Sequence, residues 1–298
     1  MQSLTSRILS LRGPRNDLVP NRPWHFLSEY EFSPAGSEAV TSTIFLTNRE
    51  CPWKCVMCDL WKNTTTESVP AGAIGEQIEF ALQRLPTARY LKLYNSGSFF
   101  DTAAISPTEW PRITELIRGF ESVTVENHPQ LCGKQCGTFR DMYGGTLEVA
   151  LGLETSHEAT LLQLNKKMCL DDYIRACDSL QDQAIEIRSF IILRPPWTSE
   201  EDGVERALHS LDFAFRHGAR VCSVIPCRAT NGFMEQLQKR GEFHPPCISS
   251  LYNVLRESLS WNRGRVFADL WDIDDSGHPE AHSLLAGLRQ MNRTQKPC

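Results

Sequence analysis

The sequence predicts an α/β fold, a partial (β/α)6 TIM-like barrel of parallel strands with an N-terminal arm and a C-terminal helical extension. Short apolar segments with strand character alternate with helical patterns, which is typical of repeated right-handed βαβ units. Six such units are fewer than the eight that close a full barrel. The 298 residues are enough for one large domain with its own core.

The individual elements follow from the spacing of apolar residues, which recurs every second residue in strands and every 3.6 residues in helices. We expect parallel strands at 43–48, 89–95, 122–126, 146–153, 185–193 and 219–225, and a last strand at 265–269. We expect helices at 72–85, 107–119, 157–182 with a break near Cys169, 200–217, 230–240 and 247–261. The Pro, Ser and Asn residues of 1–40 indicate an irregular arm, which leaves a core domain at 41–245 and an extension at 246–298.

The composition limits the classes of function. A net charge of −5 argues against a broad basic face for nucleic acid, although it leaves a local basic patch open. The chain has eleven cysteines but no signal-peptide pattern and no apolar window of 18 residues. We therefore expect a cytoplasmic protein without a membrane segment, whose thiols are reduced and free to bind metal.

Three cysteines carry the clearest signal. Cys51, Cys55 and Cys58 are spaced C-x3-C-x2-C directly after the first predicted strand. Three thiolates on one loop can hold three irons of a cubane cluster and leave the fourth iron open to a chelating molecule. A structural zinc site instead closes all four positions, usually with two C-x2-C pairs or with histidines. The spacing favours a [4Fe-4S] cluster over a zinc knuckle or three core thiols.

Polar residues follow the other predicted strands, where the carboxyl ends of a parallel barrel carry its chemistry. This placement indicates an enzyme. The residues concerned are Asn95, Ser96 and Gly97 after the second strand, Glu126 and His128 after the third, Glu154 after the fourth, and Pro226 after the sixth.

Each of these residues also has an ordinary structural interpretation. The turn after the second strand can be a plain strand-to-helix connection capped by Ser98 or Asp101. Glu154 can serve as a cap or an ion-pair partner of the next helix. Glu126 and His128 can be solvated, or can take part in substrate binding or proton transfer.

Two further features leave alternatives open. Arg188, inside the fifth strand, can point into the barrel, face the helices or pair with Glu186. Cys132 and Cys136 form a second cysteine pair, which is either part of an auxiliary cluster or two incidental thiols.

The C-x3-C-x2-C motif and its place after the first strand resemble the radical S-adenosylmethionine (SAM) superfamily. Stretches at 96–101, 125–129, 152–155 and 164–167 resemble its Elp3/MiaB-like branch. More narrowly, residues 239–246, together with 96–101, are similar to the radical SAM subunit of the archaeosine synthase family.

This resemblance implies a cofactor and a reaction. The open iron of the cluster would bind the amino and carboxylate groups of SAM. An electron from a flavodoxin- or ferredoxin-like donor would then cleave SAM to methionine and a 5′-deoxyadenosyl radical, which takes a hydrogen from an unactivated C–H bond. The family's Gly-Gly-Glu sequence is absent after the second strand. The cofactor-binding residues are therefore assigned by position: Met57, Asn95, Ser96, Gly97, Glu126, Glu154, Arg188 and Pro226.

The resemblance leaves the substrate open. The archaeosine-like interpretation implies a lyase that acts on a lysine-modified deazaguanine in tRNA, with a possible partner subunit. The alternatives are a radical SAM lyase or oxidoreductase for a small metabolite, and a non-catalytic iron–sulfur or zinc subunit. No separate N-terminal three-cysteine domain is present, which argues against sulfur insertion.

Overall fold

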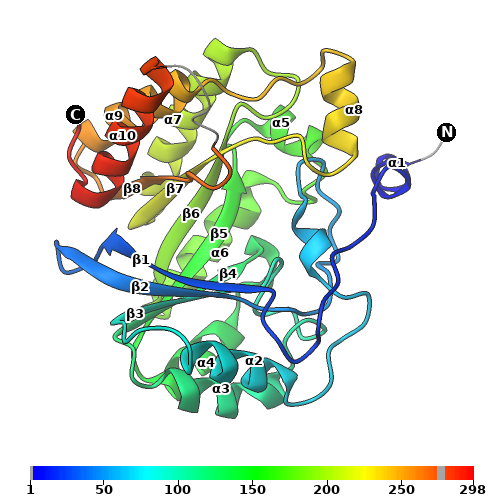
Figure 1. Cartoon of the computed structure of the whole chain (residues 1–298), viewed down its shortest axis with the longest axis vertical. Helices are drawn as coiled ribbons and strands as arrows, with labels where there is room; N and C mark the ends of the chain where they lie inside the picture. Colours follow the sequence, from blue (N-terminus) through cyan, green and yellow to red (C-terminus); the bar gives the residue numbers. More distant parts are fainter. Residues whose placement is uncertain (1–2, 274–278) are drawn as a thin grey trace.

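The computed structural model describes residues 3–273 and 279–298, and its centre is one curled sheet of eight strands in chain order (Figure 1). The last seven strands are parallel, whereas the first is antiparallel to its neighbour. The predicted fold class is confirmed, with a larger sheet than six strands. The strands are β1 (His25–Phe32), β2 (Glu38–Phe45), β3 (Tyr90–Tyr94), β4 (Ser122–Asn127), β5 (Thr146–Glu154), β6 (Glu186–Leu193), β7 (Val221–Pro226) and β8 (Arg265–Ala268).

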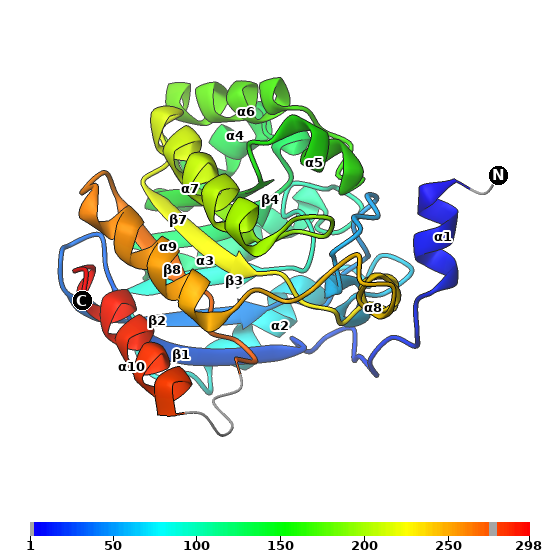
Figure 2. The same cartoon turned by 90° about the horizontal axis from the view of Figure 1, so that it is seen from above.

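Helices cover the outer face of the sheet, and α1 and α8 lie at the carboxyl ends of its strands (Figures 1 and 2). The predicted break near Cys169 is confirmed, because α5 and α6 are separate helices. The α-helices are α1 (Leu4–Ser10), α2 (Ala73–Leu82), α3 (Trp110–Ile117), α4 (Lys134–Tyr143), α5 (Glu158–Gln163), α6 (Leu170–Asp182), α7 (Glu200–Arg216), α8 (Phe233–Lys239), α9 (Ile248–Ser260) and α10 (Pro279–Thr294). Short 3-10 helices are η1 (Leu60–Asn63), η2 (Pro107–Glu109) and η3 (Pro129–Leu131).

Strand β5 shows how the sequence divides the two faces of the sheet. Leu147, Val149 and Leu151 belong to the main apolar core, whereas Glu148 binds the side chains of two neighbouring strands. Successive side chains of a strand point to opposite faces, so the apolar residues meet the helices and the polar residues line the barrel interior. The carboxyl ends of these strands open at the end where the cysteine loop lies.

The prediction of an irregular arm over 1–40 is wrong for much of its length. Residues 4–10 form α1, residues 25–32 form β1, and β2 begins at Glu38. Strand β1 pairs with β2 from His25 opposite Phe45 to Phe32 opposite Glu38. The prolines at 14, 20 and 23 dominated the prediction, but all three precede the strand, where they interrupt no ladder hydrogen bond.

Besides α1, two further helices, α4 and α10, were not predicted. Helix α4 begins after Gly133 and contains Gly137, which weakens its helical signal. Its buried residues Cys136, Phe139 and Tyr143 follow helical spacing, so tertiary packing compensates for the weak propensity. None of the helices within the described ranges has both the length and the apolar composition to span a membrane.

Candidate metal and cofactor site

The cysteine loop follows β2 at the carboxyl end of the barrel, and its backbone is held from two sides. Val56, between the cysteines, is fully buried and donates its N–H to the Leu164 carbonyl at 2.9 Å. The Asn231 amide donates to the carbonyls of Val56 at 2.7 Å and Cys58 at 3.1 Å. These bonds satisfy backbone groups that a tight loop would otherwise leave without partners.

The three thiols share a common environment. Burial raises the pKa of each of Cys51, Cys55 and Cys58 to about 12. The thiols also influence one another, because Cys58 raises the pKa of Cys51, Cys51 that of Cys55, and Cys55 that of Cys58. A buried thiolate needs a nearby positive charge, and a bound metal supplies one.

The three thiols are compatible with a cubane cluster. In the described part of the chain, no three His, Cys, Asp or Glu side chains are grouped around a common point for one metal ion. In a cubane cluster each thiolate binds a different iron, so the three sulfur atoms need not converge.

An ion pair lies beside the thiols. Lys166 Nζ contacts Glu154 Oε1 at 2.5 Å, and both side chains are buried. Burial alone would lower the pKa of Lys166, but Glu154 and the thiols of Cys55 and Cys51 raise it, so the ammonium stays charged. Glu154 does not cap the next helix, because the His157 side chain fills that position. Lys166 was not predicted as a site residue, since an isolated lysine carries no periodic or spacing signal.

The turn after β3 is built on Glu126. Its Oε1 accepts the N–H groups of Asn95 at 2.5 Å and Gly97 at 3.4 Å. Burial raises the pKa of Glu126 to about 7 against the effect of these hydrogen bonds. The turn faces the metal loop, since a Cβ built on Gly97 would lie 3.4 Å from the Cys51 Cβ.

The side chain of Asn95 supplies the test for a cofactor. Its Oδ1 and Nδ2 are both buried, and neither has a partner among the described residues. An unpaired buried amide is costly, so it indicates a group that completes its hydrogen bonds. The amino and carboxylate groups of SAM offer the donor and the acceptor that this amide lacks. The residues present therefore fit the expected cofactor.

His128 has a positioning role. Its ring stacks on Trp53 of the cysteine loop, with centroids 3.7 Å apart and planes 11° apart. Its Nδ1 accepts the Gln130 N–H at 3.2 Å, which leaves Nε2 to donate to the Lys166 carbonyl at 3.1 Å. Burial lowers the pKa of His128 to about 3, so the ring is neutral. The interpretation of His128 as a solvated residue is wrong, because its ring is buried and both of its nitrogens are hydrogen bonded.

The remaining predicted residues divide between the barrel mouth and its interior. Met57 packs against the apolar cluster that contains Val56, and Pro226 ends β7. Arg188 is the third residue of β6, away from the carboxyl ends, and its Nε donates to Glu148 Oε1 at 2.7 Å. It does point into the barrel, but its partner is Glu148 rather than Glu186. The structure therefore gives Arg188 an interior ion pair and does not bring it together with the other site residues.

Cys132 and Cys136, the latter in α4, contact each other. The two thiols hydrogen bond, and the Asn127 amide donates to Cys132 Sγ at 3.4 Å. Within residues 3–273 and 279–298, no third ligand joins them in a metal-binding group.

Comparisons with known proteins bear on the fold. No protein-family model matches the chain. Archaeosine synthase subunit beta of Methanosarcina acetivorans is 24% identical over 242 residues, which cover 75% of this chain and 68% of that protein. A radical SAM methyltransferase from Sphaerobacter thermophilus superposes with a TM-score of 0.55 at 14% identity over 87% of this chain and 77% of its own. The chain has the fold of radical SAM enzymes.

A second solved structure shares the same fold. Elp3 of Methanocaldococcus infernus superposes with a TM-score of 0.55 at 16% identity and covers 72% of this chain. The chain spans 57% of that Elp3 chain, so it corresponds to only part of the larger radical SAM protein. The predicted resemblance to the radical SAM superfamily and its Elp3-like branch is confirmed.

Proposed function

We propose that this chain is a radical SAM enzyme in which Cys51, Cys55 and Cys58 hold a [4Fe-4S] cluster and the adjoining strand ends bind SAM. The unpartnered amide of Asn95, buried beside the cysteine loop, is the observation that carries the proposal. When bound, the two cofactors supply a one-electron route to hydrogen abstraction from an unactivated C–H bond. A flavodoxin- or ferredoxin-like donor is the proposed source of the electron.

The residues of this chain bind and orient the cofactors. Asn95 completes its hydrogen bonds with SAM, while Glu126 holds the backbone of the turn that carries it. Glu154 and Lys166 place a neutralised pair of charges next to the thiols. The apolar walls around Val56 keep water from the metal loop, which protects reactive intermediates from side reactions.

For the substrate, we propose a modified base in tRNA, acted on by a lyase-type reaction with a partner subunit. The similarity to archaeosine synthase subunit beta supports this substrate and this partner. The charge around the barrel mouth supports it as well. In residues 3–23, Arg7 and Arg22 make no ion pair with a described acidic residue, whereas Arg12 and Arg15 pair with Glu50.

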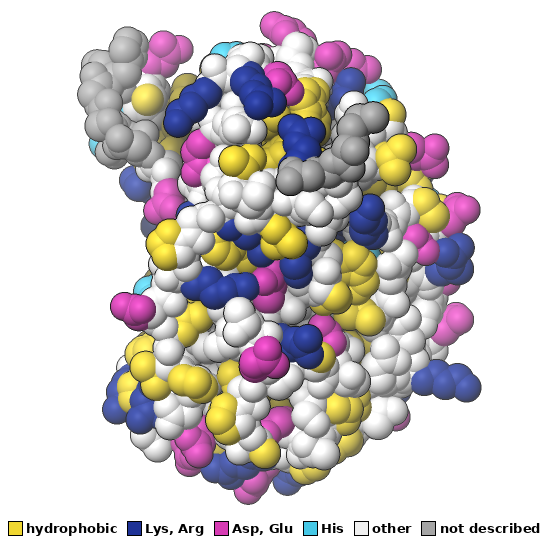
Figure 3. Space-filling view, turned by 90° about the vertical axis from the view of Figure 1, so that its right-hand side faces the viewer, with side chains coloured by type: hydrophobic (Ala, Val, Ile, Leu, Met, Phe, Trp, Pro, Cys, Tyr) yellow, Lys and Arg dark blue, Asp and Glu magenta, His cyan; other side chains and the backbone are white. Residues whose placement is uncertain are grey.

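The face that carries α1 and α8 shows Lys and Arg side chains across its middle (Figure 3). Four exposed cations near the cysteine loop, α1 and α8 make no ion pair with any described acidic residue: Arg7, Arg49, Lys167 and Lys239. A phosphate backbone is an anion that such cations can neutralise.

The RNA proposal is tested by tRNA binding as salt rises. We expect the affinity of the cluster-loaded protein to fall steeply with salt, and Arg49→Glu/Lys167→Glu to weaken binding about tenfold or more. The matched control is Arg84→Glu/Arg256→Glu, which changes the same charge at exposed positions in the turn after α2 and on α9. Absence of tRNA binding at low salt, both alone and with a partner subunit, would contradict the RNA substrate.

A small metabolite is the second candidate substrate. It is favoured by half-buried aromatic side chains inside the barrel, where Tyr94 and Phe190 lie 6.0 Å apart between ring centroids. Such a layer suits an apolar or planar small molecule. Both candidates require reduced thiols, which is why we place the protein in the cytoplasm.

A further inference from the structure

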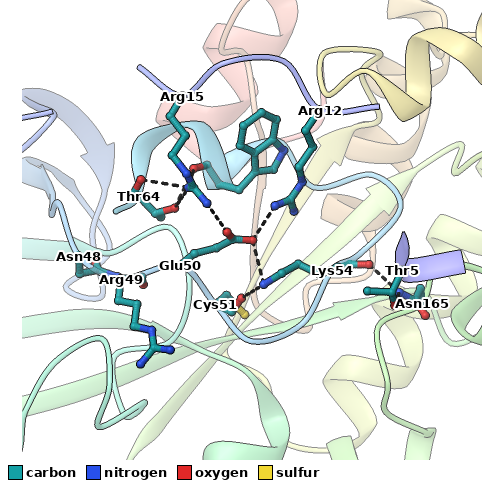
Figure 4. A network of polar contacts seen from close by, with 11 residues as sticks. Thr5, Arg12, Arg15, Asn48, Arg49, Glu50, Cys51, Lys54, Thr64 and Asn165 are labelled. Atoms are coloured by element: carbon teal, nitrogen blue, oxygen red, sulfur yellow. Dashed lines mark hydrogen bonds and ion pairs between the residues drawn. The ribbon is translucent and has the colours of Figure 1, made fainter. Parts of the chain in front are cut away.

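Glu50, the residue before Cys51, gathers three cations from two parts of the chain (Figure 4). Its Oε1 contacts Arg12 Nη1 at 2.8 Å and Lys54 Nζ at 2.9 Å, and its Oε2 contacts Arg15. The Glu50 side chain is only 12% exposed and that of Arg12 only 8%. Lys54 also donates to the Cys51 carbonyl at 2.6 Å, so this ion cluster touches the backbone of a metal ligand.

The two arginines come from residues 3–17, which lie outside the parallel barrel. Arg15 binds Thr64 Oγ1 at 2.7 Å and the Thr64 carbonyl at 3.0 Å, on the far side of the cysteine loop. The Arg12 guanidinium lies 4.6 Å from the ring centroid of Trp61. These contacts are buried or half-buried, so the arginines bridge two sides of the cysteine loop.

The segment is also held by packing and by a second amide. Ile8 is buried in the same apolar cluster as Val56 of the cysteine loop. Asn165 Nδ2 donates both to Thr5 Oγ1 at 3.2 Å and to the Lys54 carbonyl at 2.7 Å. One side chain thus connects the N-terminal segment to the backbone between two cluster ligands.

A close backbone contact completes the arrangement. A Cβ built on Gly232 would lie 1.9 Å from the Leu11 carbonyl oxygen, which shows that the segment crosses directly against the start of α8. The neighbouring Asn231 holds the carbonyls of Val56 and Cys58. The N-terminal segment, the cysteine loop and the start of α8 therefore form one packed unit.

We propose that residues 3–17, named here the N-terminal strap, are part of the metal site, and that Arg12 and Arg15 position the cysteine loop through Glu50. The inference rests on the proposed function, since it concerns the same cluster. The strap and the iron–sulfur cluster hold the same loop. Binding of the cluster therefore stabilises docking of the strap, and docking of the strap strengthens binding of the cluster by the same factor. Arg12 and Arg15 are positioning residues, because they act through Glu50.

The charges gathered around Glu50 also set the electrostatic potential at the proposed iron–sulfur cluster. A reduced cluster carries one more negative charge than the oxidised cluster, so nearby cations favour reduction and nearby anions oppose it. Removing the negative charge of Glu50 should therefore shift the midpoint potential to more positive values. Removing a positive charge at Arg12 should shift it to more negative values. If Glu50 and Arg12 had a purely structural role, their variants would not shift the midpoint potential in opposite directions.

The first experiment measures docking of the strap by limited proteolysis with subtilisin, in apoprotein and in anaerobically reconstituted protein. We expect cleavage within residues 3–17 to slow several-fold when iron is bound. We also expect Arg12→Gln/Arg15→Gln to speed cleavage and to lower iron uptake. The control is Arg293→Gln, which removes an exposed ion pair with Glu38 at a distant edge of the sheet. Equal cleavage rates with and without iron would overturn the linkage.

The closing experiment is a redox titration of wild-type protein and of Glu50→Gln, Arg12→Gln and Arg12→Lys, followed by electron paramagnetic resonance. We expect a positive shift for Glu50→Gln, a negative shift for Arg12→Gln, and a near wild-type value for Arg12→Lys, which keeps the charge. Thermal melts identify any variant that fails to fold, and Arg15→Gln, whose side chain is more exposed than that of Arg12, then carries the comparison with the same negative shift expected. The inference is overturned if the iron-loaded variants have the midpoint potential of the wild type, or if Glu50→Gln and Arg12→Gln shift it in the same direction. A wild-type protein that takes up no iron instead overturns the proposed function, and the inference falls with it.

Discussion

Lys166 and Glu154 form a buried ion pair, Nζ to Oε1 2.5 Å, whose ammonium lies near the thiols of Cys51 and Cys55. The pair joins the end of β5 to the loop before α6, so it connects two elements that both border the site. It also gives Glu154 a structural duty that is distinct from any contact with cofactor.

The first prediction concerns this pair. Glu154→Ala leaves the Lys166 ammonium buried without its partner, which should lower the free energy of unfolding of the apoprotein by about 3–5 kcal/mol. Glu154→Leu/Lys166→Met should recover most of that loss, because no charge is left buried. Urea unfolding of the two variants provides the comparison. A loss of only about 1 kcal/mol in the single variant would show that the pair is of little structural importance.

The second prediction concerns Asn95, whose buried amide has no partner in the described protein. Asn95→Leu should leave the stability of the apoprotein unchanged or raise it, because it removes unsatisfied polar atoms. Affinity for SAM should fall by about 1.5–3 kcal/mol, the usual range for hydrogen bonds to a charged group. Calorimetric titration of the reconstituted protein with SAM measures this loss.

Asn127 provides the matched control for Asn95. Its amide is buried on the next strand but already bonds the Phe100 N–H at 3.2 Å and the His128 carbonyl at 3.2 Å. Asn127→Leu should therefore destabilise the apoprotein. If both variants were equally destabilised, Asn95 would be a structural residue and the cofactor assignment would fail.

The third prediction concerns pH. Burial alone would raise the pKa of Glu50, but hydrogen bonds from Lys54, Arg12 and Arg15 hold it at about 2, below the usual value of 4.5. The ionised carboxylate therefore stabilises the folded state above pH 4.5, and this contribution, up to about 3 kcal/mol, is lost as the pH falls towards 2. Comparing thermal melts of wild type and Glu50→Gln isolates it. The gap between the two proteins should narrow from pH 5 to pH 3, and a constant gap would contradict the ion cluster.

The fourth prediction concerns the second cysteine pair. Cys132→Ser/Cys136→Ser should keep about four irons per chain and the cleavage of SAM, because these thiols contact each other and the proposed cluster takes its three ligands from the cysteine loop. Iron and acid-labile sulfide analyses measure the outcome. A wild-type protein with about eight irons, half of which the variant loses, would show an auxiliary cluster instead.

The sequence predicted the fold class because parallel strands buried on both faces leave a strong apolar signal. β5 and β6 were placed to within one residue of their observed bounds for this reason. The half-exposed strand β1 was missed, because alternating residues among prolines give a weaker signal and its partner lies in β2. Helix α4 was missed because its glycine weakens the local preference that packing later overrides.

At the site, the sequence indicates residues whose type and spacing carry the chemistry, and it misses residues that only tertiary contact brings there. The spacing of Cys51, Cys55 and Cys58 is local, so the sequence was enough to propose them. Lys166 and Arg12 have partners 12 and 38 residues away, which no local pattern indicates. Arg188 shows another limit, because strand alternation left open whether its side chain points into the barrel or towards the helices, and the structure identifies Glu148 as its partner.

The central claim is that the three loop cysteines hold the cluster that reacts with SAM. Its most direct test is iron content and reductive SAM cleavage after anaerobic reconstitution, in wild type and in Cys51→Ala/Cys55→Ala/Cys58→Ala. We predict about four irons per chain and production of 5′-deoxyadenosine and methionine by the wild type, and loss of both iron and cleavage in the variant. Full iron loading of the triple variant would contradict the account, because the cluster would then lie elsewhere in the chain.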